Sequence, residues 1–265
     1  MISSLYFFYF YIHPRRFISE FSPKDFGLAY EDIALKTKDG IKLAGWFIPQ
    51  KNSTKALIVC HGYPADKGNL LGIVAFLAPH YNLLLFDFRG LGKSQGKFST
   101  GGWKEREDFL AAVSFLKERG FNDMGAFGFS MGGAVILMAN SQGIKAIVSD
   151  SAYKDLDAIL NLIFQNFGVL RHPFVWLSKL WARIFLKMDV ELVSPLIYIS
   201  QIKAPIFLIH SQQDSQIPVE HAYQLHQRNP KSMLWVIPEA DHGSGFALWS
   251  KEYQQKVLKF FQDNL

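Results

Sequence analysis

The pentapeptide Gly128-Phe129-Ser130-Met131-Gly132 places a serine at a sharp turn between a predicted strand and a predicted helix. The apolar residues 124–127 before it are typical of a buried strand, and the small and apolar residues after it favour a helix. Glycines on either side permit a turn so tight that larger side chains would collide. Such a turn pushes the Ser130 hydroxyl above the sheet as a nucleophile, although a glycine-rich packing turn without chemistry could show the same letters.

Strand and helix patterns alternate on both sides of this turn. Short apolar runs predict buried parallel strands at residues 56–60, 83–87, 124–127, 144–149, 205–210 and 233–237. Helical patterns lie between them, at residues 70–78, 103–119, 131–141, 219–228 and 247–262. Two strand-like runs at residues 31–37 and 41–48, joined by Lys38-Asp39-Gly40, predict an antiparallel hairpin before them. We therefore expect an α/β fold with a mostly parallel, doubly wound sheet and an antiparallel N-terminal hairpin.

Residues 153–200 interrupt this alternation. They contain two amphipathic segments, residues 156–167 and 173–188, which predict an inserted helical cap. Residues 30–152 and 201–265 would then form the core, and residues 1–29 an N-terminal segment. Lys179, Arg183 and Lys187 recur every four residues in the second cap segment, apart from its apolar side chains. A cap over a pocket and a basic helix facing a membrane would both produce this pattern.

Two polar stretches follow later strands. Asp214 closes the stretch after residues 205–210, and His242 lies in Asp241-His242-Gly243 after residues 233–237. The chain order Ser130, Asp214, His242 predicts a catalytic triad in which His242 takes the serine proton and Asp214 fixes the tautomer of the ring.

The predicted oxyanion hole consists of two backbone N–H groups. Met131 supplies one because it directly follows the nucleophile, and Tyr63 supplies the other from the loop His61-Gly62-Tyr63 after residues 56–60. His61 could be a base, but we interpret it as a group that braces this loop.

These motifs together resemble the α/β-hydrolase superfamily over about residues 30 to 265. The stretch Asp87-Phe88-Arg89-Gly90-Leu91-Gly92-Lys93-Ser94 is similar to a D-x-R-G-x-G-x-S loop found in many members, where it has an architectural role. The resemblance implies a cap after the sixth strand, no metal and no organic cofactor. Within the superfamily the chain looks similar to monoacylglycerol-lipase-like and membrane-tethered serine hydrolases. It departs from many relatives at Ser211, where they have glycine.

A second carboxylate could also serve as the acid of the triad. Asp150 directly follows the strand at residues 144–149, where some α/β hydrolases place the acid. Asp214 is the preferred acid, because similarity to that superfamily implies an acid followed by a loop and a helix start such as Ile217-Pro218. We interpret Asp241 as a loop residue, since its side chain would point away from the ring of the adjacent histidine.

The serine at the turn limits the chemistry. Superfamily members that open epoxides or displace halide use an aspartate there, so acyl transfer to water remains. Aromatic residues of the cap predict a pocket for an apolar acyl group, contributed by Phe164, Phe167, Phe174 and Trp181. We expect a small-molecule ester or thioester as substrate. The alternatives are a serine peptidase of the same fold and a catalytically inactive binding protein.

The N-terminal segment departs from globular composition. Residues 5–12 read LYFFYFYI and are followed by Arg15 and Arg16, a pattern that suits the headgroup region of a membrane. The run is shorter than the ~20 residues needed to span a bilayer, and it lacks the flanks of a secretory signal. We expect a cytoplasmic or membrane-associated protein, the alternative for this segment being packing on the domain's own surface.

Composition excludes several classes. With 265 residues, of which 49% are hydrophobic and 19% charged, the chain is suited to a globular core. A single cysteine rules out an internal disulfide and a four-cysteine zinc site. The net charge of +5 comes without a basic run or nucleic-acid motif, so we expect no nucleic-acid partner. No feature of the sequence sets the oligomeric state.

Overall fold

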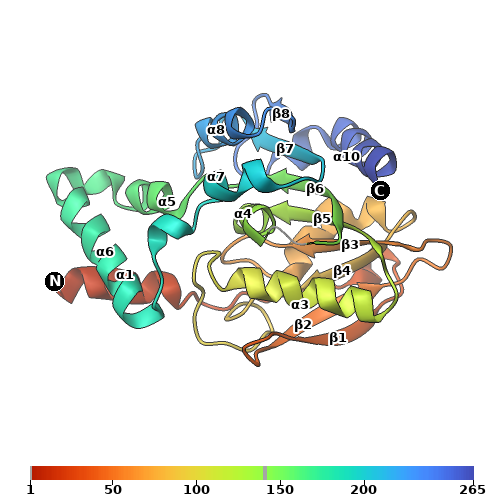
Figure 1. The fold of residues 1–265 in the computed structure, drawn as a ribbon, viewed down its shortest axis with the longest axis horizontal. Coiled ribbons are helices and arrows are strands. Elements are labelled where there is room, and N and C mark those ends of the chain that lie inside the picture. The colour runs from red at the N-terminus through yellow and green to blue at the C-terminus, as the bar shows by residue number, and fades with distance from the viewer. Residues whose placement is uncertain (1, 140–141) are drawn as a thin grey trace.

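The computed structural model describes residues 2–139 and 142–265, and its centre is an eight-stranded mixed sheet (Figure 1). The strands follow the order β1-β2-β4-β3-β5-β6-β7-β8. Strand β2 is antiparallel to both β1 and β4, and the other pairs are parallel. Their bounds are β1 (Glu31–Lys36), β2 (Lys42–Ile48), β3 (Lys55–Cys60), β4 (Asn82–Phe86), β5 (Asp123–Phe129), β6 (Ile144–Asp150), β7 (Ile206–Ser211) and β8 (Met233–Ile237). The predicted fold class is confirmed.

Helices cover both faces of the sheet and bury its apolar strands. Along β3, Ile58 and Cys60 belong to the core under α3 (Glu105–Glu118) and α4 (Met131–Ala139). Leu57 and Val59 point to the opposite core, under α2 (Leu71–Val74) and α10 (Ser250–Asn264). Helix α8 (Glu220–Arg228) packs on β7 and β8. Since both faces are buried, the central strands read as continuous apolar runs.

Two predicted helices are broken, and one ends in residues that the structure does not describe. Residues 70–78 form α2 between the 3₁₀ turns η2 (Lys67–Leu70) and η3 (Ala75–Leu77), because Gly72 and the β-branched residues after it have low helix propensity. The last predicted helix divides into α9 (Gly245–Leu248) and α10, with non-helical backbone at Trp249. The predicted end of the helix after Ser130, residues 140–141, lies outside the described residues.

In the described chain between β6 and β7, the regular elements are all helical. They are α5 (Leu156–Ile163), η4 (Gln165–Leu170), α6 (Arg171–Leu186), η5 (Val190–Leu192), α7 (Pro195–Tyr198) and η6 (Ile199–Gln201). Helix α6 begins two residues before the predicted start, since Pro173 is tolerated in a first turn, where its missing N–H has no helical partner to lose. Gly168, with φ +54° and ψ −131°, turns the chain between α5 and α6.

The N-terminal residues form helix α1 (Ile2–Ile12), which lies beside α6 at the end of the molecule that carries α5 (Figure 1). The ring of Phe7 makes edge contacts with Phe164, Phe167 and Phe174. The segment therefore packs on the protein's own surface, while its outer face keeps Ile2, Tyr6, Tyr9 and Phe10 exposed. In the described chain, no helix combines the length and apolarity required to span a membrane. A short 3₁₀ helix, η1 (Pro23–Phe26), leads from this segment to β1.

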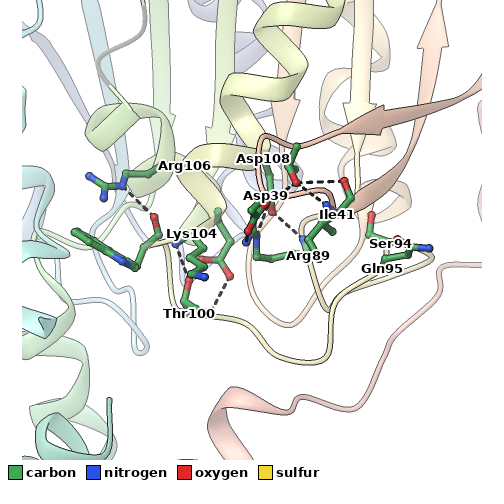
Figure 2. A network of polar contacts seen from close by, with 12 residues as sticks. Asp39, Ile41, Arg89, Ser94, Gln95, Thr100, Lys104, Arg106 and Asp108 are labelled. Carbon is green, nitrogen blue, oxygen red and sulfur yellow. Dashed lines mark hydrogen bonds and ion pairs between the residues drawn. The ribbon is translucent and has the colours of Figure 1, made fainter. Parts of the chain in front are cut away.

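Charged side chains fasten the loops at the carboxyl end of β4. Arg89 donates to Asp108 at 2.7 Å and to Asp39 at 2.7 Å, so it joins the β1–β2 hairpin to α3 (Figure 2). The hydrogen bonds from Arg89 lower the pKa of Asp39 to about 2. The Asp87 carboxylate pairs with the buried ammonium of Lys67 at 2.7 Å. The backbone carbonyl of Asp87 accepts from the Ser94 hydroxyl. These contacts fit the architectural role that the resemblance implies for residues 87–94.

Candidate active site

The turn between β5 and α4 presents Ser130 in a strained backbone conformation. Its φ of +54° lies in the left-handed region, which is costly for a residue with a side chain. Gly128 and Gly132 have to be glycines because other backbone atoms lie too close to leave room for a Cβ. A Cβ on Gly128 would lie 2.5 Å from the Gly132 carbonyl oxygen, and a Cβ on Gly132 would collide with the Cys60 carbonyl oxygen. The turn is thus packed tightly against the end of β3, with the serine at its tip.

His242 lies between Ser130 and Asp214, and its two ring nitrogens face one each. Nε2 is 3.2 Å from the Ser130 Oγ, and Nδ1 is 2.7 Å from the Asp214 Oδ2. An ionised carboxylate only accepts, so Nδ1 carries the proton and donates it to Asp214. Nε2 is then the unprotonated nitrogen and accepts the Ser130 hydroxyl. The structure therefore brings the three predicted residues together with the serine proton directed at a base.

The Asp214 carboxylate is fixed by its own loop. Its Oδ1 accepts from the backbone N–H groups of Ile217 at 2.7 Å and Gln216 at 3.0 Å, which leaves Oδ2 for the histidine. His210 donates through Nε2 to the Ile217 carbonyl at 2.7 Å and braces the same loop. Ser211, the departure from many relatives, ends β7, and its carbonyl accepts from the Asp214 N–H at 3.3 Å. The loop therefore places the Asp214 carboxylate against His242 although residue 211 is serine and not glycine.

Asp150, the alternative acid, has other partners. Its carboxylate accepts from the Tyr253 hydroxyl at 2.7 Å and from the Ser151 hydroxyl at 2.9 Å. Burial raises its pKa, and these hydrogen bonds partly oppose that shift. Its backbone carbonyl accepts the N–H of Ser130 at 2.8 Å, so Asp150 supports the turn through the main chain.

Asp241 has a positioning contact that the sequence did not indicate. Its Oδ1 accepts from the N–H groups of Ser215 at 2.8 Å and His242 at 2.7 Å. Its side chain faces these amides, so it ties the loop of the acid to the loop of the histidine. The hydrogen bonds, led by that from the Ser215 backbone, lower the pKa of Asp241. Ser215 precedes Asp241 by 26 positions, and no sequence pattern around either residue predicts the contact.

The predicted oxyanion groups lie beside the serine. Met131 is the first residue of α4, where a backbone N–H has no partner within the helix. Tyr63 follows Gly62, on which a Cβ would lie 3.1 Å from the Ser130 Cβ, so this loop passes close to the nucleophile. His61 is buried, accepts from the Phe88 N–H at Nε2, and faces the Gly62 carbonyl with Nδ1. Burial lowers its pKa, and the residue braces the loop as expected.

A cavity of about 420 Å³ begins at Ser130 and extends between the core, α5, α6 and α1. Its volume is in the range of small-molecule sites, about 300–1,000 Å³. Among the described residues, no side chain that lines it carries a charge. The apolar wall from α5 consists of Leu156, Ile159, Leu160, Leu162, Ile163 and, just past the helix end, Phe164. The cavity is therefore suited to an uncharged, apolar group next to the serine.

The predicted aromatic pocket residues divide into two groups. Phe164 lines the cavity, whereas Phe167 and Phe174 contact Phe7, and Trp181 donates through Nε1 to the Ser4 hydroxyl at 3.2 Å. These three side chains join the cap to α1 instead of lining the cavity, because α1 covers them. The spacing of apolar residues in α5, at intervals of three and four, is the sequence signal for the helix wall that lines this cavity.

Lys179 and Arg183 of α6 are paired with acids. Lys179 lies 2.5 Å from Asp157 and 3.0 Å from Glu191, and Arg183 lies 3.3 Å from Asp189. Arg16, behind α1, donates to the carbonyls of loop residues 92, 94 and 96. Two of the three predicted basic residues of the cap therefore face acids, whereas Arg16 keeps its charge and donates to neutral carbonyls.

Comparison with known proteins identifies the family of the chain. Residues 75–265, more than half of the chain, match the prolyl oligopeptidase family. The chain belongs to the prolyl oligopeptidase family. This family member is similar to the solved esterase Pf2001 of Pyrococcus furiosus, with 32% identity, 95% of this chain and 99% of that chain covered, and a TM-score of 0.79. It is also similar to the uncharacterized protein YfhR of Escherichia coli O157:H7, 28% identical over 248 residues that cover 87% of this chain and 80% of that protein.

More distant structures share the fold alone. The α/β hydrolase GrgF of a Penicillium species is 20% identical to this prolyl oligopeptidase family member, with a TM-score of 0.70 over 89% of this chain and 99% of that chain. The predicted membership of the α/β-hydrolase superfamily is confirmed, and the finer placement near monoacylglycerol lipases stays a prediction.

Proposed function

We propose that this protein is a serine hydrolase that cleaves carboxylic esters or thioesters carrying an apolar acyl group. The observation that carries the proposal is the hydrogen-bonded series Ser130, His242, Asp214, which opens into an apolar cavity. The Pyrococcus furiosus relative, an esterase by name, supports the same class of reaction.

The geometry performs acyl transfer in two steps. The Ser130 Oγ attacks the carbonyl carbon while its proton passes to the Nε2 of His242, and Asp214 stabilises the resulting imidazolium. The N–H groups of Met131 and Tyr63 hold the negative oxygen of the tetrahedral intermediate. The intermediate collapses as the ester C–O bond breaks and His242 returns the proton to the leaving alcohol. Water then repeats the sequence on the acyl-enzyme, with His242 as base, and releases the carboxylic acid.

The lining of the cavity favours apolar acyl groups over charged peptides. A charged peptide terminus placed in this cavity would lose its hydration without gaining a charged partner from the described lining residues. An alkyl or aryl chain gains from the same burial, by about 0.8 kcal/mol per methylene. The family name keeps a peptidase as the second function to be tested.

Two substrate panels test the proposal. The purified protein is assayed with p-nitrophenyl esters of increasing acyl length and with peptidyl p-nitroanilides, and Ser130→Ala serves as the inactive control. We expect ester hydrolysis that improves from acetyl toward octanoyl, with at most weak cleavage of the anilides. Rapid anilide cleavage with negligible ester hydrolysis would establish the peptidase instead, and no turnover of either would favour the binding protein.

The outer surface of α1 and α6 supports a finer proposal, that the enzyme acts next to a lipid surface. Both helices expose large apolar side chains, Tyr6 and Phe10 on α1 and Trp176, Ile184 and Phe185 on α6. Tyrosine, tryptophan and phenylalanine are suited to the interface of a bilayer. Because Lys179 and Arg183 are paired with acids, apolar burial rather than attraction to anionic lipid would drive such binding.

Sedimentation with neutral and anionic vesicles tests this finer proposal. We expect the protein to sediment with both kinds, with little loss in high salt, and the double variant Tyr6→Ser/Phe10→Ser to stay in the supernatant. Tyr223→Ser, on exposed α8, is the matched control. Failure of the unaltered protein to bind either vesicle would leave a hydrolase without lipid contact.

A further inference from the structure

Helix α1 lies along the cavity that contains Ser130, and its C-terminal end contacts Tyr63 and Ser99, which line the same cavity. Tyr11 and Ile12 line the cavity there. The Ile12 carbonyl accepts from the Ser99 N–H at 2.8 Å, and the Ser99 hydroxyl lies 3.9 Å from the Sδ of Met131, the residue after the serine. The last turn of α1 is therefore near the position at which a substrate ester would be attacked.

Phe8 lines the same cavity one turn away from this end. Residues four apart share one face of a helix and lie about 6 Å apart along its axis. Phe8 is 8% exposed and stacks with Phe185 of α6, whereas its neighbour Tyr9 is 59% exposed on the outer face. Ile12 and Phe8 thus form successive steps of one wall that leads away from Ser130.

Contacts at both ends keep α1 in place. Near its start, the Trp181 Nε1 donates to the Ser4 hydroxyl at 3.2 Å, and near its end the Tyr63 hydroxyl donates to the Tyr11 carbonyl at 2.6 Å. Arg16 fastens the following residues through three loop carbonyls. Because several independent contacts hold the helix, shortening one side chain on its inner face enlarges the cavity without releasing the wall.

We infer that α1 sets the acyl-chain length that the enzyme accepts. Resting on the proposed function, the inference names the substrate class as esters of linear acyl chains, the first carbons of which lie against Ile12 and later carbons against Phe8. The N-terminal helix is then part of the binding site, a role distinct from membrane contact. Since only the inner face does this, substitutions on the outer face should leave chain-length preference unchanged.

Three variants test the inference with p-nitrophenyl esters from acetyl to hexadecanoyl. Phe8→Ala lengthens the cavity, so its optimum in kcat/KM should move to longer chains, with a gain of about fourfold for each additional methylene that becomes buried. Ile12→Trp fills the cavity near the serine, so its optimum should move to shorter chains. Tyr9→Ala, an aromatic residue on the outer face of the same helix, is the control and should keep the profile of the unaltered protein. Shifts in opposite directions for the first two variants support the inference.

A binding measurement separates this inference from the proposed function. The affinities of the sodium salts of linear fatty acids, from butanoate to hexadecanoate, are measured by calorimetry with the same variants. A matching shift in preferred length supports the role of α1 even if no ester is cleaved, in which case only the proposed function fails. Ester hydrolysis by all variants with one unchanged length profile, or equal shifts in Tyr9→Ala, would overturn the inference while leaving the hydrolase intact. Circular dichroism confirms that each variant is folded.

Discussion

Replacing Asp214 with asparagine exchanges one carboxylate oxygen for an NH₂ group and reverses the hydrogen bonding of His242. The Oδ1 of Asp214 accepts from two backbone N–H groups, those of Gln216 and Ile217. The oxygen of an asparagine side chain has to occupy this position, because an amide NH₂ there would face two donors. The NH₂ group then occupies the Oδ2 position, 2.7 Å from the His242 Nδ1, and donates to it. The ring must therefore carry its proton on Nε2, where it can no longer accept the proton of Ser130.

The expected loss is large because the wrong tautomer removes the general base. In a serine protease triad the equivalent change lowers kcat by about 10⁴-fold, and we expect Asp214→Asn to lower ester turnover by a similar order. Octanoyl ester hydrolysis is followed by stopped-flow or long-time assays, with unfolding curves to confirm that the variant is folded.

Asp150→Asn is the matched control for this substitution. Its partners Tyr253 and Ser151 are hydroxyls, which can rotate to accept from an amide, so we expect a loss below about tenfold. If Asp150→Asn lost more activity than Asp214→Asn, or if Asp214→Asn stayed within tenfold of the unaltered protein, the reasoning from these hydrogen bonds would be refuted.

Two further predictions concern the folded state. Gly132→Ala should lower the free energy of unfolding by about 1–3 kcal/mol and abolish ester turnover, because its Cβ would collide with the Cys60 carbonyl, whereas Gly72→Ala, whose Cβ meets no atom within 4 Å, should be neutral or slightly stabilising. Burial lowers the pKa of His221 to about 4, so between pH 6.5 and 4 the unfolded chain binds more protons than the folded one, and stability should fall as the pH drops through this window. That loss, up to about 3 kcal/mol, should be reduced in His221→Gln; equal pH dependence of urea midpoints in both proteins would contradict it.

The elements that the sequence predicted well are those with a local physical signal. The central strands are buried on both faces and therefore read as uninterrupted apolar runs, as residues 56–60 do. The turn at Ser130 can be predicted from the sequence because the Cys60 carbonyl lies so close that residue 132 has to be glycine, and this glycine is part of the recognisable pattern. Asp214 and His242 were visible because each follows a strand whose place in the sheet determines where its loop emerges.

The contacts that the sequence missed join segments far apart in the chain. Trp181 meets Ser4 across 177 positions, and this contact, with those of Phe7, places α1 over the cap aromatics that were expected to form the pocket. Aromatic size alone suggested Phe167 and Phe174, although the amphipathic pattern of α5 held the better signal. The paired state of Lys179 was equally invisible, because Glu191 lies beyond the end of its helix.

The central claim, that Ser130 is the nucleophile of an acyl-transfer enzyme, is tested most directly by covalent labelling. The 265-residue chain is treated with a fluorophosphonate and digested, and the modified peptide is identified by mass spectrometry. We predict a single adduct on the Ser130 side chain, with no labelling of Ser130→Ala and strongly slowed labelling of His242→Ala, whose serine lacks its base. Labelling of Ser130→Ala at the rate of the unaltered protein, or an adduct on another residue only, would contradict this assignment.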